Sequence, residues 1–346
     1  MDDVPVIDMF NHIFPSGYLS ELARRCPNLA FKTDSRTSAV KIFNTQTGVF
    51  VAYSLPNSVF DTPEKRLEDM DAYGVYIQVL SASLPAAEPS LLSTTPENVV
   101  AIAKSINDSI AKIVEKHSDR FLGAAEVPVV DENAALEEFD RAVNDLGMKC
   151  IQLYTQMAGL PLDHEMFHPL FERAVKYDVP ILLHPNNPPP TQRRGYEHDY
   201  SLSIVFGWPY ETTLALSRLV LSGVLEKFPT LKIVSHHMGG MVAHFSGRLQ
   251  ILESLLEGWK YRKKLLDYFK MFYVDTVLGG YIQAAKCGYE IFGPDHIVFG
   301  SDYPFGPENG KAFIRQAKDV VKGLSIPENE QAKILYKNAK KLLRIH

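Results

Sequence analysis

Residues 179–184, Val-Pro-Ile-Leu-Leu-His, have the pattern of a short buried β-strand that ends on a polar side chain. Seven other segments are equally brief and rich in large apolar or β-branched residues, which is typical of strands in a parallel sheet. The eight predicted strands are Val4–Asp8, Val75–Ser81, Phe121–Ala125, Lys149–Leu153, Val179–His184, Leu231–His236, Met271–Asp275 and His296–Ser301. Longer amphipathic stretches separate most of them, so the chain alternates strand with helix.

The segment Pro96–His117 is the clearest predicted helix. Its apolar residues recur three and four positions apart, and Thr95 is expected to cap its N-terminus. Glu211–Leu225, Met241–Leu256 and Glu328–Leu343 have the same spacing. Strands that alternate with helices pair in parallel through right-handed crossovers. Eight such units favour a closed (β/α)8 TIM barrel, with an open doubly wound sheet as the alternative that periodicity leaves.

Two segments exceed what a minimal barrel needs. Residues 28–60 alternate as short strands do and predict a small β insertion over the barrel mouth, after the first strand. Pro185–Pro209 holds five prolines and follows the fifth strand, where a long loop is typical of a lid or a substrate-binding loop. Internal repeats and low-complexity tails are absent from the sequence. Residues 1–346 are therefore expected to form one barrel domain.

Composition excludes several classes of protein. The chain has 346 residues and a net charge of −5, with 36 Lys+Arg against 41 Asp+Glu, which argues against a nucleic-acid surface. No apolar stretch approaches the roughly 20 residues that span a bilayer. The acidic start Met1–Pro5 does not resemble a signal peptide. Cys26, Cys150 and Cys287 are odd in number and far apart, as in a cytoplasmic protein with reduced thiols.

At four predicted strand ends, a His or an acid lies where a pocket would be. His12 follows the first strand, His184 ends the fifth, His236 and His237 lie at the end of the sixth, and Asp302 follows the eighth. The C-terminal ends of barrel strands converge on one pocket. Two imidazoles and a carboxylate suit a divalent cation such as Zn²⁺.

We therefore expect His12, His184 and Asp302 to bind a metal ion, with His237 as an acid or base beside it. Each residue alone has a structural explanation that is more common. A single strand-end histidine is usually a hydrogen-bonded structural residue, and Asp302 could cap a turn. The joint pattern is what favours a site.

Several stretches, in their order and spacing, resemble the aminocarboxymuconate-semialdehyde decarboxylase-like branch of the metal-dependent amidohydrolase-related family. They cover nearly the whole chain, and each is modest alone. The stretches are residues 7–15, Arg66-Leu67 with Met70-Asp71 and Gly74-Val75, Leu183–Pro185, Leu231–Gly240, Phe299–Pro304, and Trp208–Thr212 leading into Val224–Pro229.

The resemblance implies a barrel with one metal ion, usually zinc. The family's ligands are a His-x-His pair on the first strand, a His on the fifth and an Asp on the eighth, with a His of the sixth strand as acid or base. By motif these roles fall on His12, His184, Asp302 and His237, the last because Gly-Gly and Arg248 follow it at the family's spacing. Known reactions include decarboxylation of aromatic or muconate-type acids, hydration, and hydrolysis of C–C bonds or lactones. A homodimer or higher homo-oligomer is also implied.

Two departures from the family pattern matter. Phe10 replaces the first ligand of the His-x-His pair, and Phe cannot bind a metal. We therefore expect weaker binding of Zn²⁺, or of another divalent metal such as Mn²⁺, and metal-free chemistry stays open because related lactonases work without one. No Arg lies between Lys41 and Lys65 to hold a carboxylate, although Arg248 matches the family's other carboxylate-binding Arg, which reaches across a dimer interface. Aminocarboxymuconate semialdehyde is therefore not the expected substrate.

Other residues are expected to bind substrate. Arg193 and Arg194 could clamp a carboxylate with bidentate geometry, or form a solvated charge pair on a loop. Phe10 and Trp208 would make the pocket aromatic, although core packing is the more common role of such residues.

Three functions remain open. The first is a metal-dependent non-oxidative decarboxylase of a hydroxylated aromatic or unsaturated carboxylic acid. The second is a hydrolase of a lactone, C–C or amide bond, with or without a metal. The third is a barrel that only binds a ligand. The expected partner in each enzymatic case is a small molecule.

Overall fold

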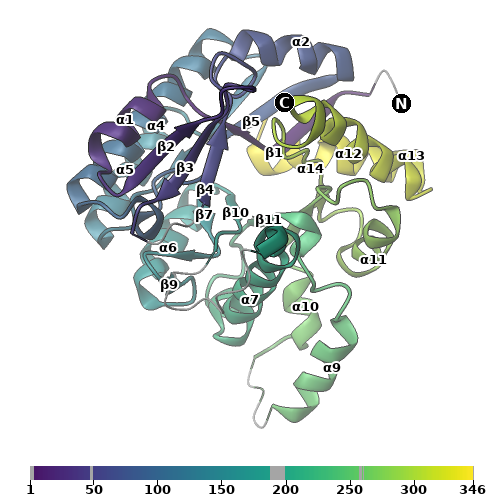
Figure 1. Ribbon diagram of the computed structural model, residues 1–346. Helices are drawn as coiled ribbons and strands as arrows, with labels where there is room; N and C mark the ends of the chain where they lie inside the picture. Colours follow the sequence, from purple (N-terminus) through teal and green to yellow (C-terminus); the bar gives the residue numbers. More distant parts are fainter. Residues whose placement is uncertain (1–3, 47–49, 188–198, 257–258, 260, 346) are drawn as a thin grey trace.

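The computed structural model describes residues 4–46, 50–187, 199–256, 259 and 261–345. Its main feature is a sheet of eight parallel strands ringed by helices (Figure 1). All eight predicted strands are present. In sheet order they are β1 (Val6–Ile13), β5 (Val75–Ala82), β6 (Phe121–Glu126), β7 (Cys150–Tyr154), β10 (Ile181–His184), β11 (Ile233–Ser235), β12 (Tyr273–Asp275) and β13 (Ile297–Val298).

Backbone hydrogen bonds join the two ends of this sheet. Met9 N donates to Phe299 O at 2.9 Å, and Asp302 N donates to Phe10 O at 2.9 Å. The segment that follows β13 thus runs beside β1 and closes the circle. The predicted barrel is confirmed over the open sheet.

Helices lie between successive strands, as the alternating pattern predicted. Thr95 caps the longest one, because its side chain accepts a hydrogen bond from Asn98 N at 3.4 Å. The main helices are α2 (Pro63–Tyr73), α4 (Pro96–Lys116), α5 (Glu132–Asn144), α6 (His168–Tyr177), α7 (Trp208–Leu221), α9 (Ser246–Leu255), α11 (Ile282–Phe292) and α12 (Lys311–Gly323). Shorter ones are α1 (Tyr18–Arg25), α3 (Pro89–Leu92), α8 (Val224–Lys227), α10 (Leu265–Phe269), α13 (Glu328–Ala332) and α14 (Asn338–Leu343).

Three helix boundaries differ from the expected ones. The helix predicted from Met241 begins at Ser246, since the preceding loop has left-handed residues at Met238, Gly239 and Gly240. The helix predicted over 211–225 divides into α7 and α8 at Gly223, whose φ of 86° lies in the left-handed region. Residues 328–343 contain a single π-helical turn between α13 and α14.

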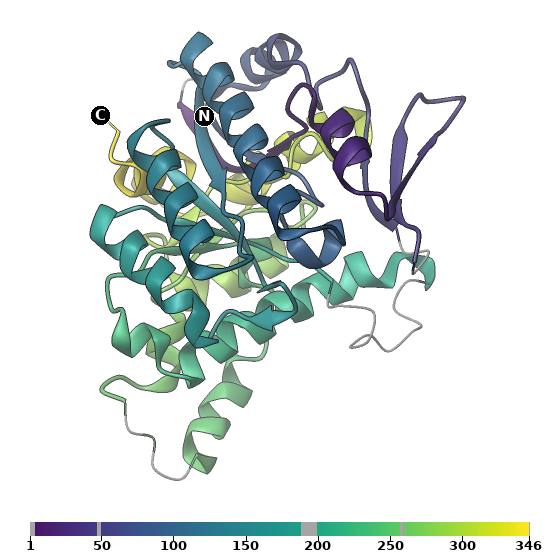
Figure 2. The ribbon, with the colours of Figure 1, turned by 90° about the vertical axis from the view of Figure 1, so that its left-hand side faces the viewer.

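The predicted β insertion after the first strand is present. It consists of the antiparallel strands β2 (Leu29–Thr33), β3 (Val40–Asn44) and β4 (Phe50–Ser54), which stand out from the barrel in Figure 2. A second, shorter hairpin follows β7 and pairs β8 (Gln156–Met157) with β9 (Leu160–Pro161). Within the described residues, no helix has the length and apolar character of a membrane span.

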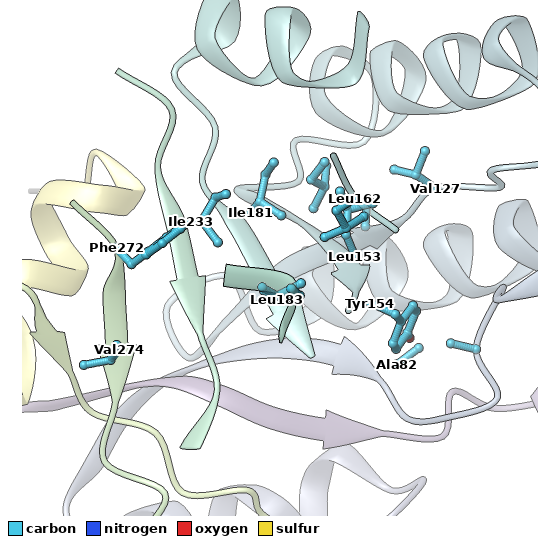
Figure 3. Packing of buried hydrophobic residues seen from close by; sticks show 14 of the residues in the cluster. Ala82, Val127, Leu153, Tyr154, Leu162, Ile181, Leu183, Ile233, Phe272 and Val274 are labelled. Atoms are coloured by element: carbon cyan, nitrogen blue, oxygen red, sulfur yellow. The ribbon is translucent and has the colours of Figure 1, made fainter. Parts of the chain in front are cut away.

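Alternation along the strands divides the core into two clusters. Ile181, Leu183 and Ile233 belong to the larger cluster, which packs between strands and helices (Figure 3). Leu182 and Val234 belong to the smaller cluster inside the barrel. Successive side chains of a strand point to opposite faces, so the residues two positions after Leu182 and Val234 also point inward. Those residues are His184 and His236.

Candidate active site

The predicted strand ends converge at one end of the barrel. One ring nitrogen each of His12, His184 and His236 lies within 4.8 Å of the other two. Asp302 Oδ1 lies 3.2 Å from His12 Nε2 and 3.6 Å from His236 Nε2. The structure thus brings together the three expected ligands His12, His184 and Asp302, and places His236 among them.

Hydrogen bonds at Nδ1 fix the orientation of all three imidazoles. Ser81 Oγ donates its only hydrogen to Asn11 O at 2.7 Å. The same hydroxyl oxygen therefore accepts the hydrogen bond from His12 Nδ1 at 3.3 Å. His184 Nδ1 donates to Pro185 O at 2.6 Å, and His236 Nδ1 donates to the Asp275 carboxylate. Because each Nδ1 is a donor, Nε2 is the atom through which each ring could bind a cation, which at His236 requires the loss of the Nε2 proton.

The donor set fits a divalent metal ion. The Nε2 atoms of His12 and His236 are buried and make no well-aligned hydrogen bond with any described residue. Buried polar atoms without a partner are costly and call for an explanation such as an ion. Imidazole nitrogens with a carboxylate oxygen are ligands that Zn²⁺ accepts, and Mn²⁺ accepts carboxylate and imidazole as well.

The charges in this cluster are unequal. Burial lowers the pKa of His12 and holds that of His184 well below its ordinary range, and neighbouring imidazoles add to the effect. Burial also acts on His236, but the Asp275 and Asp302 carboxylates outweigh it and raise the pKa to about 9. Burial would raise the pKa of Asp302, yet hydrogen bonds with His12 and His236 lower it instead. The positive charge therefore rests on His236, between two carboxylates.

Phe10 lies against this cluster. Its side chain is fully buried and its ring stacks on that of His236, with centroids 4.1 Å apart and an interplanar angle of 13°. Phe10 is not among the described residues that line the pocket. Its expected role in binding substrate stays a prediction, whereas its contact with His236 is direct.

The loop after β11 presents His237 to the pocket. His237 and Met238 have φ values of 55° and 54°, and the His237 ring lies 3.8 Å from that of His236, centroid to centroid. Gly240 allows the loop to approach α7, because a Cβ there would lie 2.4 Å from Pro209 O. Burial lowers the pKa of His237 to about 3. The neutral ring can therefore accept a proton from a substrate group and return it.

Arg66 secures the end of β1. Its guanidinium is fully buried and donates to His12 O at 2.7 Å, to Asn11 Oδ1 at 2.8 Å and to Val59 O at 3.1 Å. It also lies over the Tyr303 ring, 4.7 Å from the centroid. One buried side chain thus ties β1 to the segment that carries Asp302.

A pocket of about 1130 Å³ opens over the cluster. His184, His237 and Asp302 line it together with residues of the β insertion and of the segment before α7. Its apolar lining consists of Phe43, Val51, Ala52, Leu84, Ile204, Val205, Trp208, Val277, Leu278, Phe305 and Phe313. The described lining residues include no Lys or Arg.

The remaining predicted residues lie elsewhere. Trp208 lines the pocket as expected, whereas Arg248 is exposed on α9 and is not among the described lining residues. Arg193 and Arg194 fall outside the described residues. Motif spacing selected His237 and passed over His236 and its partner Asp275. Counting alternate positions from the buried Val234 is the signal that identifies His236.

Comparisons with known proteins agree with this geometry. A model of the amidohydrolase family matches residues 57–345. Gamma-resorcylate decarboxylase of Rhizobium sp. (strain MTP-10005) is 31% identical over 304 residues, which cover 84% of this chain and 90% of that protein. The 2-amino-3-carboxymuconate-6-semialdehyde decarboxylase of Dictyostelium discoideum is 27% identical over 254 residues, 70% of this chain and 67% of that protein.

Solved structures are similar over almost the full length. A crystal structure of 2,6-dihydroxybenzoate decarboxylase with bound 2,6-dihydroxybenzoate has a TM-score of 0.80 and 27% identity, and the match covers 99% of both chains. Dihydroxybenzoic acid decarboxylase from Polaromonas sp. JS666, with bound manganese and the inhibitor 2-nitroresorcinol, has a TM-score of 0.79 and 25% identity. That match covers 99% of this chain and 97% of the other.

Proposed function

Because the chain belongs to the amidohydrolase family, we propose that it is a metal-dependent non-oxidative decarboxylase of a hydroxylated aromatic carboxylic acid. The observation that carries this proposal is the cluster of His12, His184, His236 and Asp302, of which His184 and Asp302 line an apolar, aromatic pocket. Similarity to decarboxylases of dihydroxybenzoates supports the substrate class.

We propose that His12, His184 and Asp302 hold the cation, which is Zn²⁺ or Mn²⁺. The manganese bound by the similar enzyme from Polaromonas supports a divalent metal. When bound, the cation supplies positive charge to the substrate carboxylate and a neighbouring hydroxyl oxygen. This charge matters because the described pocket lining offers no Lys or Arg.

The protein's own groups then move one proton. His237 or Asp302 accepts a proton from a hydroxyl group of the substrate and returns it to the ring carbon that bears the carboxylate, where it forms a C–H bond. The C–C bond to the carboxylate breaks, CO₂ leaves, and the ring regains its aromatic electrons. Apolar side chains such as Trp208, Phe305 and Phe313 favour this step, since they stabilise neutral CO₂ relative to the carboxylate.

A panel of hydroxybenzoic acids tests the proposal, with CO₂ release as the readout and ¹⁸O-labelled water as solvent. We expect CO₂ from at least one ortho-hydroxylated benzoate, and an aromatic product without solvent oxygen. Release of CO₂ from none of them would contradict the proposal. Solvent ¹⁸O in a cleaved lactone or ester would instead favour the hydrolase, because only hydrolysis incorporates water oxygen.

We also propose that the protein is a homodimer in the cytoplasm. Helix α9 supports the dimer, because none of its residues is buried and Ile251 and Leu255 are 61% and 71% exposed. Arg248 lies on the same helix and would reach the partner's pocket. The three free cysteines support a reducing compartment.

A further inference from the structure

The residue two positions before His12 offers no atom that can bind a metal, since it is Phe10. We propose that His236 replaces this missing ligand, so that the cation has three imidazole nitrogens and the Asp302 carboxylate around it, and that Asp275 holds His236 in place. This inference rests on the proposed metal dependence and deepens it. It gives His236 and His237 separate tasks, one at the metal and one at the substrate.

The position of His236 supports a ligand role. Its side chain has no exposed surface, so contact with substrate in the pocket is not its function. Its ring nitrogen is grouped with those of His12 and His184 within 4.8 Å, and its Nε2 lies 3.6 Å from Asp302 Oδ1. A cation among these atoms would satisfy the two buried Nε2 atoms that have no well-aligned partner in the described structure.

Asp275 has the geometry of an orienting carboxylate. It is fully buried at the end of β12, and its Oδ2 accepts the hydrogen bond from His236 Nδ1. Its Oδ1 accepts from Val277 N at 3.0 Å and from Met238 N at 3.4 Å. Metal-binding histidines commonly donate their second ring N–H to a carboxylate, which fixes the tautomer and the ring orientation. Asp275 is therefore a positioning residue.

Phe10 and Gly300 complete the support. The Phe10 ring lies flat on His236, 4.1 Å away between centroids, and closes the side from which a first-strand ligand would come. A Cβ at Gly300 would lie 2.9 Å from Phe10 Cβ and 3.0 Å from Asp275 Cβ. Only glycine at position 300 lets Phe10 and Asp275 approach this closely. Phe10, which offers no ligand atom, and Asp275, which orients His236, are thus packed against the same residue.

Metal titration of the metal-free protein tests the inference, with Mn²⁺ followed by its electron paramagnetic resonance signal. We expect His236→Ala to weaken Mn²⁺ binding about 100-fold or more, and Asp275→Asn about 10- to 100-fold. The matched control is His244→Ala, an exposed histidine outside both groups of possible metal ligands, which should bind Mn²⁺ as the unaltered protein does. Circular dichroism of each variant establishes that it is folded.

A rescue variant separates ligand loss from misfolding. We expect Phe10→Glu combined with His236→Ala to recover Mn²⁺ affinity, because a carboxylate returns at the first-strand position. X-ray absorption of the zinc-loaded protein should give three imidazole ligands, and two in His236→Ala. Unchanged Mn²⁺ affinity in His236→Ala, or two imidazoles in the unaltered protein, would overturn the inference. Neither readout depends on turnover, so a failure to release CO₂ would count against the proposed function alone.

Discussion

Asp302 is the residue on which the proposed chemistry depends most. It contacts His12 and His236 and also lines the pocket, so it connects the metal site with the substrate. We expect Asp302→Asn to lower kcat for CO₂ release by about 10²- to 10⁴-fold, the usual range for loss of a general acid or base. Steady-state kinetics on the active benzoate measures this. An unchanged kcat would contradict a role of Asp302 in the proton transfer.

Glu126 contributes to the pH dependence of stability, beside Asp8, whose pKa burial raises to about 7. Burial raises the pKa of Glu126 from 4.5 to about 8, although Ala87 N and Gln152 donate to its carboxyl group. Between these pH values the unfolded chain has lost the proton and the folded chain retains it. The contribution of Glu126 to the free energy of unfolding should therefore fall as pH rises through this window, by at most about 1.4 kcal/mol per pH unit.

The variant Glu126→Gln should reduce this dependence by the contribution of one proton, and the contribution of Asp8 should remain. Urea unfolding at about pH 5 and about pH 8 measures the change in slope. The control is Glu137→Gln, an exposed position on the neighbouring helix α5, which should keep the slope of the unaltered protein. Equal slopes in the two variants would contradict the assignment of the proton to Glu126.

At the scale of elements, the loop after β11 decides where both histidines lie. Gly240 has a φ of 64°, and a Cβ there would meet Pro209 O at 2.4 Å and Thr213 Oγ1 at 2.7 Å. We expect Gly240→Ala to destabilise the protein by about 1–3 kcal/mol and to lower the rate of CO₂ release, since the loop must move. Thermal unfolding and turnover measure the two effects.

Gly147→Ala is the matched control for this loop. Gly147 also has a positive φ, 69°, but a Cβ there would meet no atom within 4 Å. An alanine at position 147 therefore introduces the same kind of backbone strain, but it does not collide with α7. We expect a smaller loss of stability and an unchanged rate, and an equal effect of the two substitutions would show that the approach to α7 is unimportant.

The strands could be predicted from sequence because each is a short apolar run between amphipathic helices. Barrel closure depends on backbone hydrogen bonds such as Met9 N to Phe299 O, which no side-chain pattern records. The predicted start of α9 at Met241 was wrong, because residues 241–245 form turns before the helix begins at Ser246. Local patterns thus indicate which elements form, whereas tertiary contacts and loop strain set their ends.

The same limit applies to the site. His12, His184 and Asp302 follow or end predicted strands, so their convergence follows from the barrel alone. To choose between His236 and His237, one must know which side chains of β11 point into the barrel. Val234 is buried inside the barrel, so the side chain two positions later, His236, points inward as well. Spacing to Arg248 carries no information about this direction. Asp275 ends the predicted strand Met271–Asp275, so its place at the same end of the barrel follows from the same pattern, whereas its hydrogen bond to His236 is a tertiary contact that the sequence does not record.

For the whole molecule, the proposed dimer makes a prediction about mass. One chain has a mass of 38.9 kDa, so light scattering should give about twice this value for the unaltered protein. Leu255→Glu places a charge on the exposed apolar face of α9 and should produce monomers. Glu253→Gln on the same helix is the control and should remain dimeric. A monomeric unaltered protein would contradict the proposal.

The measurement that tests the central claim most directly is the rate of CO₂ release as a function of metal occupancy. Protein freed of metal by a chelator is reloaded with Zn²⁺ or Mn²⁺, and bound metal and CO₂ are quantified in the same samples. We predict no release without metal and a rate that rises in proportion to occupancy, up to one ion per chain. A full rate in the metal-free protein, or no release at full occupancy, would contradict the account.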